Sequence, residues 1–205
     1  MRHLVLAISV VFCMGITGCA AMEKTRIVVP NHVETHKSTV PGAHSPKSEK
    51  VNKREWTLLS EFSTILRAGT AKVNNVKLAT ESINGHILVP GEEFSYNQVV
   101  GNRTADKGYR EAPSFLNGKK SKSIGGGVCQ LSSTVHGAAV KAKLMVTERH
   151  RHSLPVHYPS WAEATVSYGS KDMKFINNTG RYIKIIARVT HIDRQKIVVV
   201  QIWVK

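Results

Sequence analysis

Three consecutive glycines and one valine stand before a cysteine, Cys129, and a run of apolar residues at helical spacing follows it. Glycine adopts backbone conformations that side chains forbid, so we expect Cys129 at a junction between a loop and a helix. A helix N-terminus favours a thiolate, and its free N–H groups can hold an oxyanion. The alternative is a buried cysteine that packs as a small hydrophobe. The candidate oxyanion loop comprises Gly125, Gly126, Gly127, Val128 and Gln130.

The first 18 residues have a basic start and a short apolar run, a pattern typical of an export signal. At the end of this signal, residues 16–19 read Ile-Thr-Gly-Cys and resemble the lipobox of bacterial lipoproteins. Cys19 would then be lipidated and would anchor the chain to a bacterial membrane in the cell envelope, on the extracytoplasmic side. A plain secretory signal is the alternative. Residues 19–53 are polar and predict a flexible tether, which leaves residues 54–205 as one domain.

Cysteine content and charge narrow the function classes. Cys13 leaves with the signal and Cys19 carries lipid, so Cys129 is the single free thiol of the mature chain and no internal disulfide is expected. The formal net charge is +15. We find no nucleic-acid motif, and an exported basic protein meets anionic membranes, anionic polymers and wall peptides instead. No cofactor motif is present, and the sequence does not reveal the oligomeric state.

Apolar periodicity predicts an α+β fold. Even spacing from Trp56 to Leu66 predicts a strand over residues 55–66. Steps of three and four predict a helix over 75–84, capped by Asn74 or Asn75, and a second helix over 129–144. Further strands are predicted over residues 87–89, 164–168, 173–175, 182–189 and 196–204.

These elements predict an antiparallel, β-rich scaffold with two main helices in a single domain. Turn residues at 177–180 should join two antiparallel strands, and the apolar run 197–200 should be buried on both faces. Residues 100–123 are basic and loop-like.

Two histidines, His150 and His152, fall on one face if their segment is extended. Either could act as a general base, with the other as its partner, and we leave open which one acts. A zinc site needs two further ligands at matched spacing, which the sequence does not offer, so we rank metal binding below acid–base chemistry. His136 lies about two turns from Cys129, and we assign it a structural role. Substrate binding is assigned to Ser132, Arg149 and Arg110.

Several ordered motifs resemble the VanW family. They are 90–97 (Pro-Gly-Glu-Glu-Phe-Ser-Tyr-Asn), 125–132 (Gly-Gly-Gly-Val-Cys-Gln-Leu-Ser), 148–153 (Glu-Arg-His-Arg-His-Ser) and 175–179 (Phe-Ile-Asn-Asn-Thr). The family's Asp-Ala-Thr-Val segment stands here as Glu-Ala-Thr-Val at 163–166.

Some members of this family look like peptidoglycan L,D-transpeptidases, which implies that Cys129 is the nucleophile. It would attack a carbonyl in a wall tetrapeptide, expel D-alanine and form a thioester that an amine resolves. His152 or His150 would carry the proton. Two alternatives stay open, a non-catalytic module that binds wall peptides or an anionic polymer, and a metal-dependent hydrolase that uses the two histidines.

Overall fold

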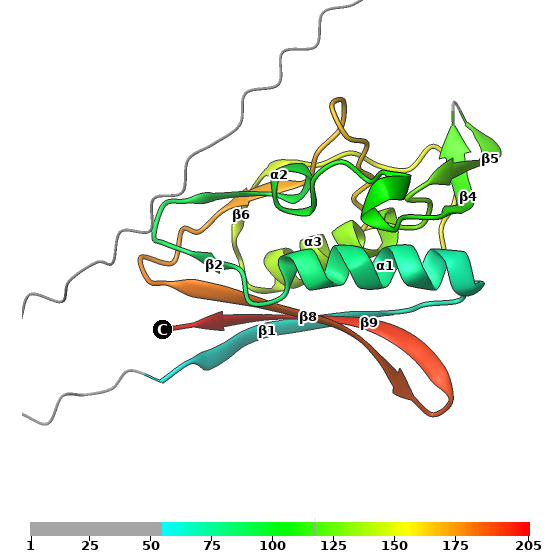
Figure 1. Cartoon of the computed structure of the whole chain (residues 1–205). Helices are drawn as coiled ribbons and strands as arrows, with labels where there is room; N and C mark the ends of the chain where they lie inside the picture. The colour runs from blue at the N-terminus through cyan, green and yellow to red at the C-terminus, as the bar shows by residue number, and fades with distance from the viewer. Residues whose placement is uncertain (1–54, 117) are drawn as a thin grey trace, which may run out of the picture. The chain divides into compact units, whose positions relative to one another are not determined.

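The computed structural model describes residues 55–116 and 118–205, which belong to one compact unit (Figure 1). The predicted signal, the lipid site Cys19 and the tether lie outside the described residues. Within the described ranges, no helix combines the length and apolar character that a membrane crossing needs. The prediction of a mixed α+β fold is confirmed.

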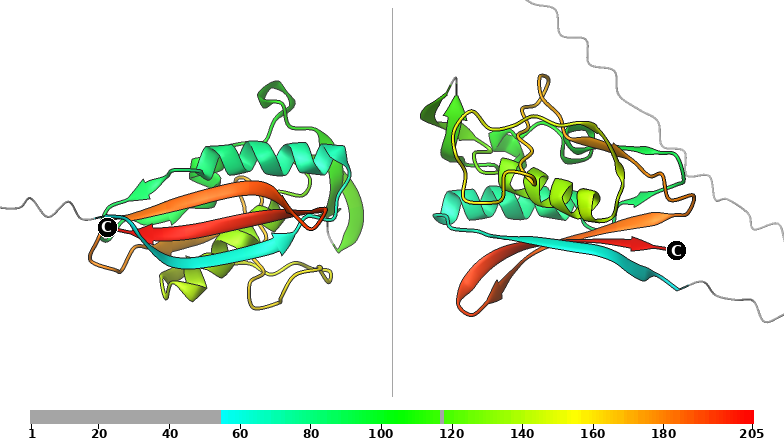
Figure 2. Two further views of the ribbon diagram at one scale, coloured as in Figure 1. Left: turned by 90° about the horizontal axis from the view of Figure 1, so that it is seen from below. Right: turned by 180° about the vertical axis from the view of Figure 1, so that it is seen from behind.

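A four-stranded antiparallel sheet forms the base of the molecule, with strand order β1-β9-β8-β2. Helices α1 and α3 cover one face of it, and the view from below shows the long strands in front of these helices (Figure 2). Most of the core lies between them, and β9 contributes Val198, Val200 and Ile202 to it. The elements are β1 (Thr57–Ile65), α1 (Thr70–Ile83), β2 (Ile87–Leu88), α3 (Cys129–Lys141), β8 (Ile183–Ile192) and β9 (Gln195–Val204).

The hairpin between β8 and β9 turns at Asp193 and Arg194, whose φ angles are 48° and 64°. Two consecutive positive φ values suit the right-handed twist of a hairpin, and glycine or asparagine usually occupies such positions. Because Asp193 and Arg194 stand there instead, the sequence did not reveal this turn. Residues 197–200 are all buried, as predicted.

The predicted turn at residues 177–180 does not join two paired strands. It leads from β7 (Lys174–Ile176) in a second sheet to β8 in the first. The reason is Asn177, which is fully buried and donates to the carbonyl oxygens of Leu88, Val89 and Arg181 at 3.2, 3.0 and 2.7 Å. Its amide ties a corner between the two sheets.

The smaller sheets lie on the far side of the helices (Figure 1). A three-stranded sheet has the order β3-β7-β6, and β4 and β5 form a separate hairpin within the region predicted as a loop. Their strands carry many polar residues, so the apolar alternation that marks a strand is weak. The remaining elements are β3 (Glu93–Ser95), α2 (Tyr96–Val100), the 3-10 turn Ala105–Lys107, β4 (Glu111–Leu116), β5 (Lys119–Ile124) and β6 (Met145–Glu148).

One face of α3 binds an extended chain segment instead of a strand. Positions 129, 132, 133 and 136 project side chains on that face, and these bond the backbone of residues 162, 164 and 166. We call this contact the α3 zipper. The strand predicted over 164–168 is therefore wrong, since the zipper takes backbone groups that a ladder would use and only a bridge from Ser167 to Lys171 forms. The structural role predicted for His136 is confirmed, because its Nδ1 lies 3.1 Å from the Ala162 oxygen.

Helix α1 begins five residues before the predicted start, at Thr70, with Gly69 at its N-cap. Asn75 is therefore not a cap. Its buried amide donates to the carbonyl oxygens of Arg110 and Gly126 at 2.8 and 3.0 Å, and its oxygen accepts the Arg110 N–H at 2.8 Å. The second helix begins at Cys129 as predicted and ends at Lys141, three residues before the predicted end.

We predict that Asn75→Ala lowers the free energy of unfolding by at least about 3 kcal/mol, because three backbone groups lose their partner. Asn74→Ala is the matched control, since Asn74 donates one exposed bond to the Gly108 oxygen at 2.9 Å and one long bond to the Asn75 side-chain oxygen at 3.5 Å. We expect it to cost about 1 kcal/mol or less. Urea unfolding of both variants measures the difference, and equal losses would contradict the role given to Asn75.

Candidate functional site

The glycine loop packs against backbone and side chains that leave no room for a Cβ. A methyl group on Gly126 would overlap the carbonyl oxygen of Ala112, and one on Gly127 would overlap the side chain of Lys72. Gly125 and Gly127 also have φ angles of 78° and 98°, which side chains rarely adopt. The three glycines therefore bring the start of α3 close to β4 and α1.

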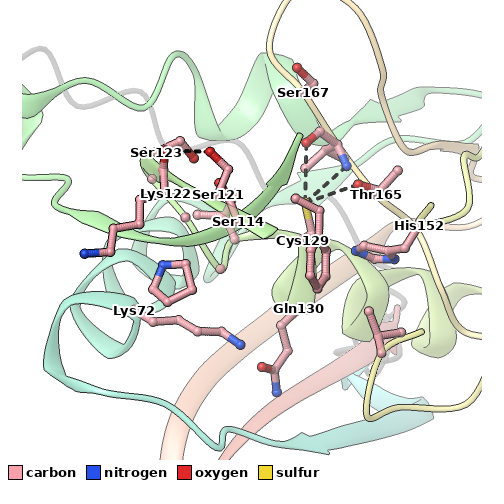
Figure 3. A pocket seen from close by; sticks show the side chains of 18 of the residues that line it. Lys72, Ser114, Ser121, Lys122, Ser123, Cys129, Gln130, His152, Thr165 and Ser167 are labelled. Atoms are coloured by element: carbon pink, nitrogen blue, oxygen red, sulfur yellow. Dashed lines mark hydrogen bonds between the residues drawn. The ribbon is translucent and has the colours of Figure 1, made fainter. Parts of the chain in front are cut away.

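Cys129 is the first residue of α3 and is half-buried at the wall of a pocket (Figure 3). Its Sγ lies 3.4 Å from the Thr165 hydroxyl and donates to the Val166 oxygen at 3.4 Å. The Val166 N–H donates to the sulfur at 3.5 Å. The thiol is thus the end of the α3 zipper, and the contacts fix its direction.

Two amides at the junction of the glycine loop and α3 are candidate donors to an oxyanion. Within the described residues, neither the N–H of Gly127 nor that of Cys129 donates to a protein acceptor. The N–H groups of Val128 and Gln130 donate to the oxygens of Gly125 and Gly127, at 3.4 and 3.1 Å. Fewer backbone N–H groups of the candidate oxyanion loop are therefore free to donate than the sequence suggested.

The side chain of Gln130 joins α3 to the main sheet. Its Nε2 donates to the Thr64 hydroxyl at 3.1 Å and to the Ile65 oxygen at 2.8 Å. Gln130 is 4% exposed, so both bonds are made in the interior. Its function in the structure is to anchor the first turn of the helix.

His152 lies beside Cys129 in the pocket (Figure 3). Its Nε2 is 3.2 Å from the Tyr158 hydroxyl, and its Nδ1 is buried without a partner among the described residues. Burial lowers the pKa of His152 from its ordinary 6.5, Lys171 and Lys72 lower it further, and Glu163 acts in the opposite direction. The imidazole is therefore neutral at pH 7 and can accept a proton. Burial likewise raises the pKa of Tyr158, which keeps its phenol protonated.

Lys72, in the first turn of α1, also lines the pocket. Its side chain occupies the space where Gly127 lacks a Cβ, and its ammonium group points toward the side that holds Gln130 and Cys129 (Figure 3). Burial lowers the pKa of Lys72, while the charge of a Cys129 thiolate raises it. The sequence reasoning missed this residue because it began the helix at residue 75.

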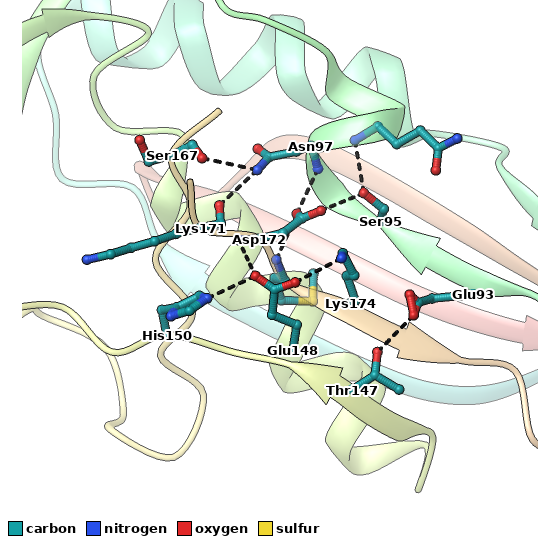
Figure 4. A network of polar contacts seen from close by, with 12 residues as sticks. Glu93, Ser95, Asn97, Thr147, Glu148, His150, Ser167, Lys171, Asp172 and Lys174 are labelled. Carbon is teal, nitrogen blue, oxygen red and sulfur yellow. Dashed lines mark hydrogen bonds and ion pairs between the residues drawn. The ribbon is translucent and has the colours of Figure 1, made fainter. Parts of the chain in front are cut away.

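His150 lies in a different cluster (Figure 4). Its Nε2 is 2.9 Å from Glu148 Oε1, and Lys174 pairs with Glu148 Oε2 at 2.9 Å. Bonds from Lys174, His150 and the Asp172 backbone lower the pKa of Glu148 to about 2. This cluster ties β6 to the segment before β7, and His150 does not line the cysteine pocket.

The three residues assigned to substrate binding also lie elsewhere. Ser132 is fully buried and donates to the Ala164 oxygen at 2.5 Å. Arg149 donates to the oxygens of Glu163 and Ser160 at 2.6 and 2.7 Å, which braces the loop after β6. Arg110 is exposed outside the pocket, with its backbone held by Asn75. None of the three lines the pocket.

The pocket has a volume of about 1100 Å³ and is lined by basic residues without any Asp or Glu. Within the described residues, no three of His, Cys, Asp and Glu come together as a metal site. Lys72, Tyr158 and Thr165 are among the wall residues that sequence reasoning did not assign to the site. The Glu-Ala-Thr-Val segment was the available signal for Thr165. The basic lining residues are Arg67, Lys72, Arg103, Lys120, Lys122, Arg151 and Lys171.

Fold and site together define an α+β protein with a cysteine at the start of a buried helix, in a basic pocket. Residues 71–203 match the family model described as VanW like protein, and the chain belongs to the VanW family.

Curated relatives support this assignment. The uncharacterised protein YoaR of Bacillus subtilis (strain 168) is 41% identical over 132 residues, which cover 63% of this chain and 44% of YoaR. The vancomycin B-type resistance protein VanW of Enterococcus faecalis (strain ATCC 700802 / V583) is 32% identical over 115 residues, covering 53% of this chain and 42% of that protein. The matches thus span less than half the length of these relatives. No solved structure matches the chain.

We predict that Gly126→Ala lowers the free energy of unfolding by about 1–3 kcal/mol or more, because the added methyl group meets the backbone of β4. Gly69→Ala is the control, since a Cβ there meets nothing within 4 Å. We expect it to change stability by less than about 1 kcal/mol. Thermal unfolding measures both, and a neutral Gly126→Ala would contradict the close packing of the loop.

Proposed function

We propose that this chain is a cysteine acyltransferase of the bacterial cell envelope that acts on peptidoglycan stem peptides. The observation that carries the proposal is the place of Cys129, at a helix start, beside two free amides and a neutral histidine, on the wall of a basic pocket. The resistance-protein name of one VanW relative supports a role in cell-wall chemistry. Lipidation of Cys19, and thereby attachment to a bacterial membrane on the extracytoplasmic side of the cell envelope, is part of this proposal.

In the reaction, Cys129 Sγ attacks the carbonyl of the residue that precedes D-alanine in a tetrapeptide. A carbon–sulfur bond forms, and the tetrahedral oxyanion accepts hydrogen bonds from the N–H groups of Gly127 and Cys129. The carbon–nitrogen bond then breaks, and the thiol proton ends on the amine of D-alanine. The amine of a second stem attacks the resulting thioester and releases the thiol. Water in place of that amine would make the reaction a carboxypeptidation.

His152 is the proton carrier in this scheme. It lines the pocket, it is neutral at pH 7, and the Tyr158 hydroxyl holds one ring nitrogen while the other has no partner among the described residues. Within the described part of the chain, no hydrogen bond joins it to Cys129. Such contacts commonly tighten only when substrate binds. His150 is engaged with Glu148 and has no place in this scheme.

A second candidate is a binding module without catalysis. The basic lining of the pocket favours it, since cations alone can hold a wall peptide or an anionic polymer. In that case the thiol of Cys129 has only its structural contacts with Val166 and Thr165.

We expect intact-mass spectrometry to separate the two candidates. The purified chain, incubated with a synthetic tetrapeptide stem, should gain the mass of the stem less D-alanine, and Cys129→Ala should gain nothing. Cys129→Ser is the matched control for binding, because its hydroxyl can retain a hydrogen bond to Val166. Binding without any adduct or D-alanine release would contradict the acyltransferase and support the binding module.

We also predict the pH dependence of acylation. Because the pKa of His152 lies below 6.5 in the folded protein, the base is neutral above that pH. Acylation measured as kcat/KM should therefore hold constant as the pH falls to about 6.5 and decline only in more acidic solution. His152→Gln should lower the rate by about 10²- to 10⁴-fold and remove the acid limb. His150→Gln should leave the rate and the acid limb unchanged. If His150→Gln instead lowers the rate and removes the acid limb while His152→Gln does not, His150 is the base.

A further inference from the structure

The pocket cations come from parts of the chain that are far apart in sequence. Arg67 follows β1, Lys72 is in α1, Lys122 is in β5, and Lys171 precedes β7. A charge run on one exposed strand would be explained by solvent alone. Cations that several separate segments bring around one cavity instead indicate an anionic ligand.

None of these cations is neutralised by the described part of the protein. There, the single Lys or Arg within ion-pair distance of a carboxylate is Lys174, which lies outside the cysteine pocket. Arg103 donates to the Asn97 side-chain oxygen and the Gly101 carbonyl, both of which are uncharged acceptors. The positive potential of the pocket is therefore available to a ligand.

Lys72 is the cation best placed to act at the scissile bond. Its methylene groups are fixed against Gly127, one of the two residues that offer a free amide to the oxyanion. Its ammonium group points toward the side of the pocket that holds Cys129 (Figure 3). A substrate group that contacts Lys72 must therefore be close to the carbonyl that Cys129 attacks.

In a peptide whose last bond is broken, the charged group nearest to the scissile carbonyl on the leaving side is the terminal carboxylate. It belongs to the very next residue, so a lysine beside the nucleophile can reach it while the carbonyl faces the sulfur. A carboxamide at the same place keeps the shape and loses the charge.

We propose that the site recognises a free carboxylate on the leaving residue through Lys72, and that it therefore cleaves only the last peptide bond of a donor. The proposal rests on the proposed function for its reaction, whereas its binding component stands on the pocket alone. It restricts the donor to a stem that ends one residue after the acylated position, and it excludes a stem extended beyond that residue.

The test compares two synthetic tetrapeptides that differ only in a D-alanine acid or a D-alanine amide at the C-terminus. For the wild type, we expect kcat/KM for acylation to be about 10- to 100-fold higher with the acid, the range of one charge-assisted hydrogen bond. Lys72→Gln should remove most of this preference. Lys77→Gln is the matched control, because Lys77 is exposed on the same helix outside the pocket, and it should keep the preference.

Binding to Cys129→Ser, measured by calorimetry, separates this proposal from the reaction itself. If Cys129→Ser binds the acid more tightly than the amide but the wild type is not acylated, the carboxylate site is supported and the acyltransferase is overturned. Equal acylation by acid and amide would overturn the carboxylate site and leave the acyltransferase standing. A preference for the acid that survives in folded Lys72→Gln, as judged by thermal unfolding, would overturn the assignment to Lys72.

Discussion

The buried side-chain amide of Asn75 is the contact on which the site depends. Through its nitrogen and oxygen it binds both backbone groups of Arg110, and it also binds the Gly126 oxygen. A helix, the chain entering β4 and the glycine loop are therefore held at one point in the interior. A buried amide with all these bonds made is favourable, and a partly satisfied one is costly, so the loop has one stable position. The free amides beside Cys129 follow from that position.

The α3 zipper fixes the other wall of the site. The Ser133 side chain bonds the N–H and the carbonyl oxygen of Ala164, and the Cys129 side chain bonds the same two groups of Val166. The segment 162–166 therefore runs extended along the helix. Substrate that reaches the sulfur must compete with Val166 and Thr165 for it. The thiol is thus held in a defined direction by weak hydrogen bonds to its sulfur. Breaking them when the sulfur attacks a carbonyl carbon costs little free energy.

Sequence reasoning predicted the parts of the fold that periodicity encodes and missed those that tertiary hydrogen bonds decide. The strand β9 and the start of α3 at Cys129 follow from apolar spacing and from the glycines. Asn75 looked like a helix cap, because a buried amide that binds a distant loop leaves no local pattern. For the same reason, two histidines two residues apart could not be distinguished before the structure placed His150 with Glu148 and His152 with Tyr158. Lys72 was overlooked because its position depends on how α1 packs against Gly127.

The positive charge of the pocket affects the stability of the fold. Seven like charges around one cavity repel one another, and Lys72 is in addition partly removed from water, which disfavours its charged form. Both effects destabilise the folded chain, and the described structure offers these cations no carboxylate in return. Departures from local stability rules tend to occur where a protein acts. An anion in the pocket would relieve the repulsion, so occupancy by ligand and stability of the fold should rise together, which a purely structural basic surface would not require.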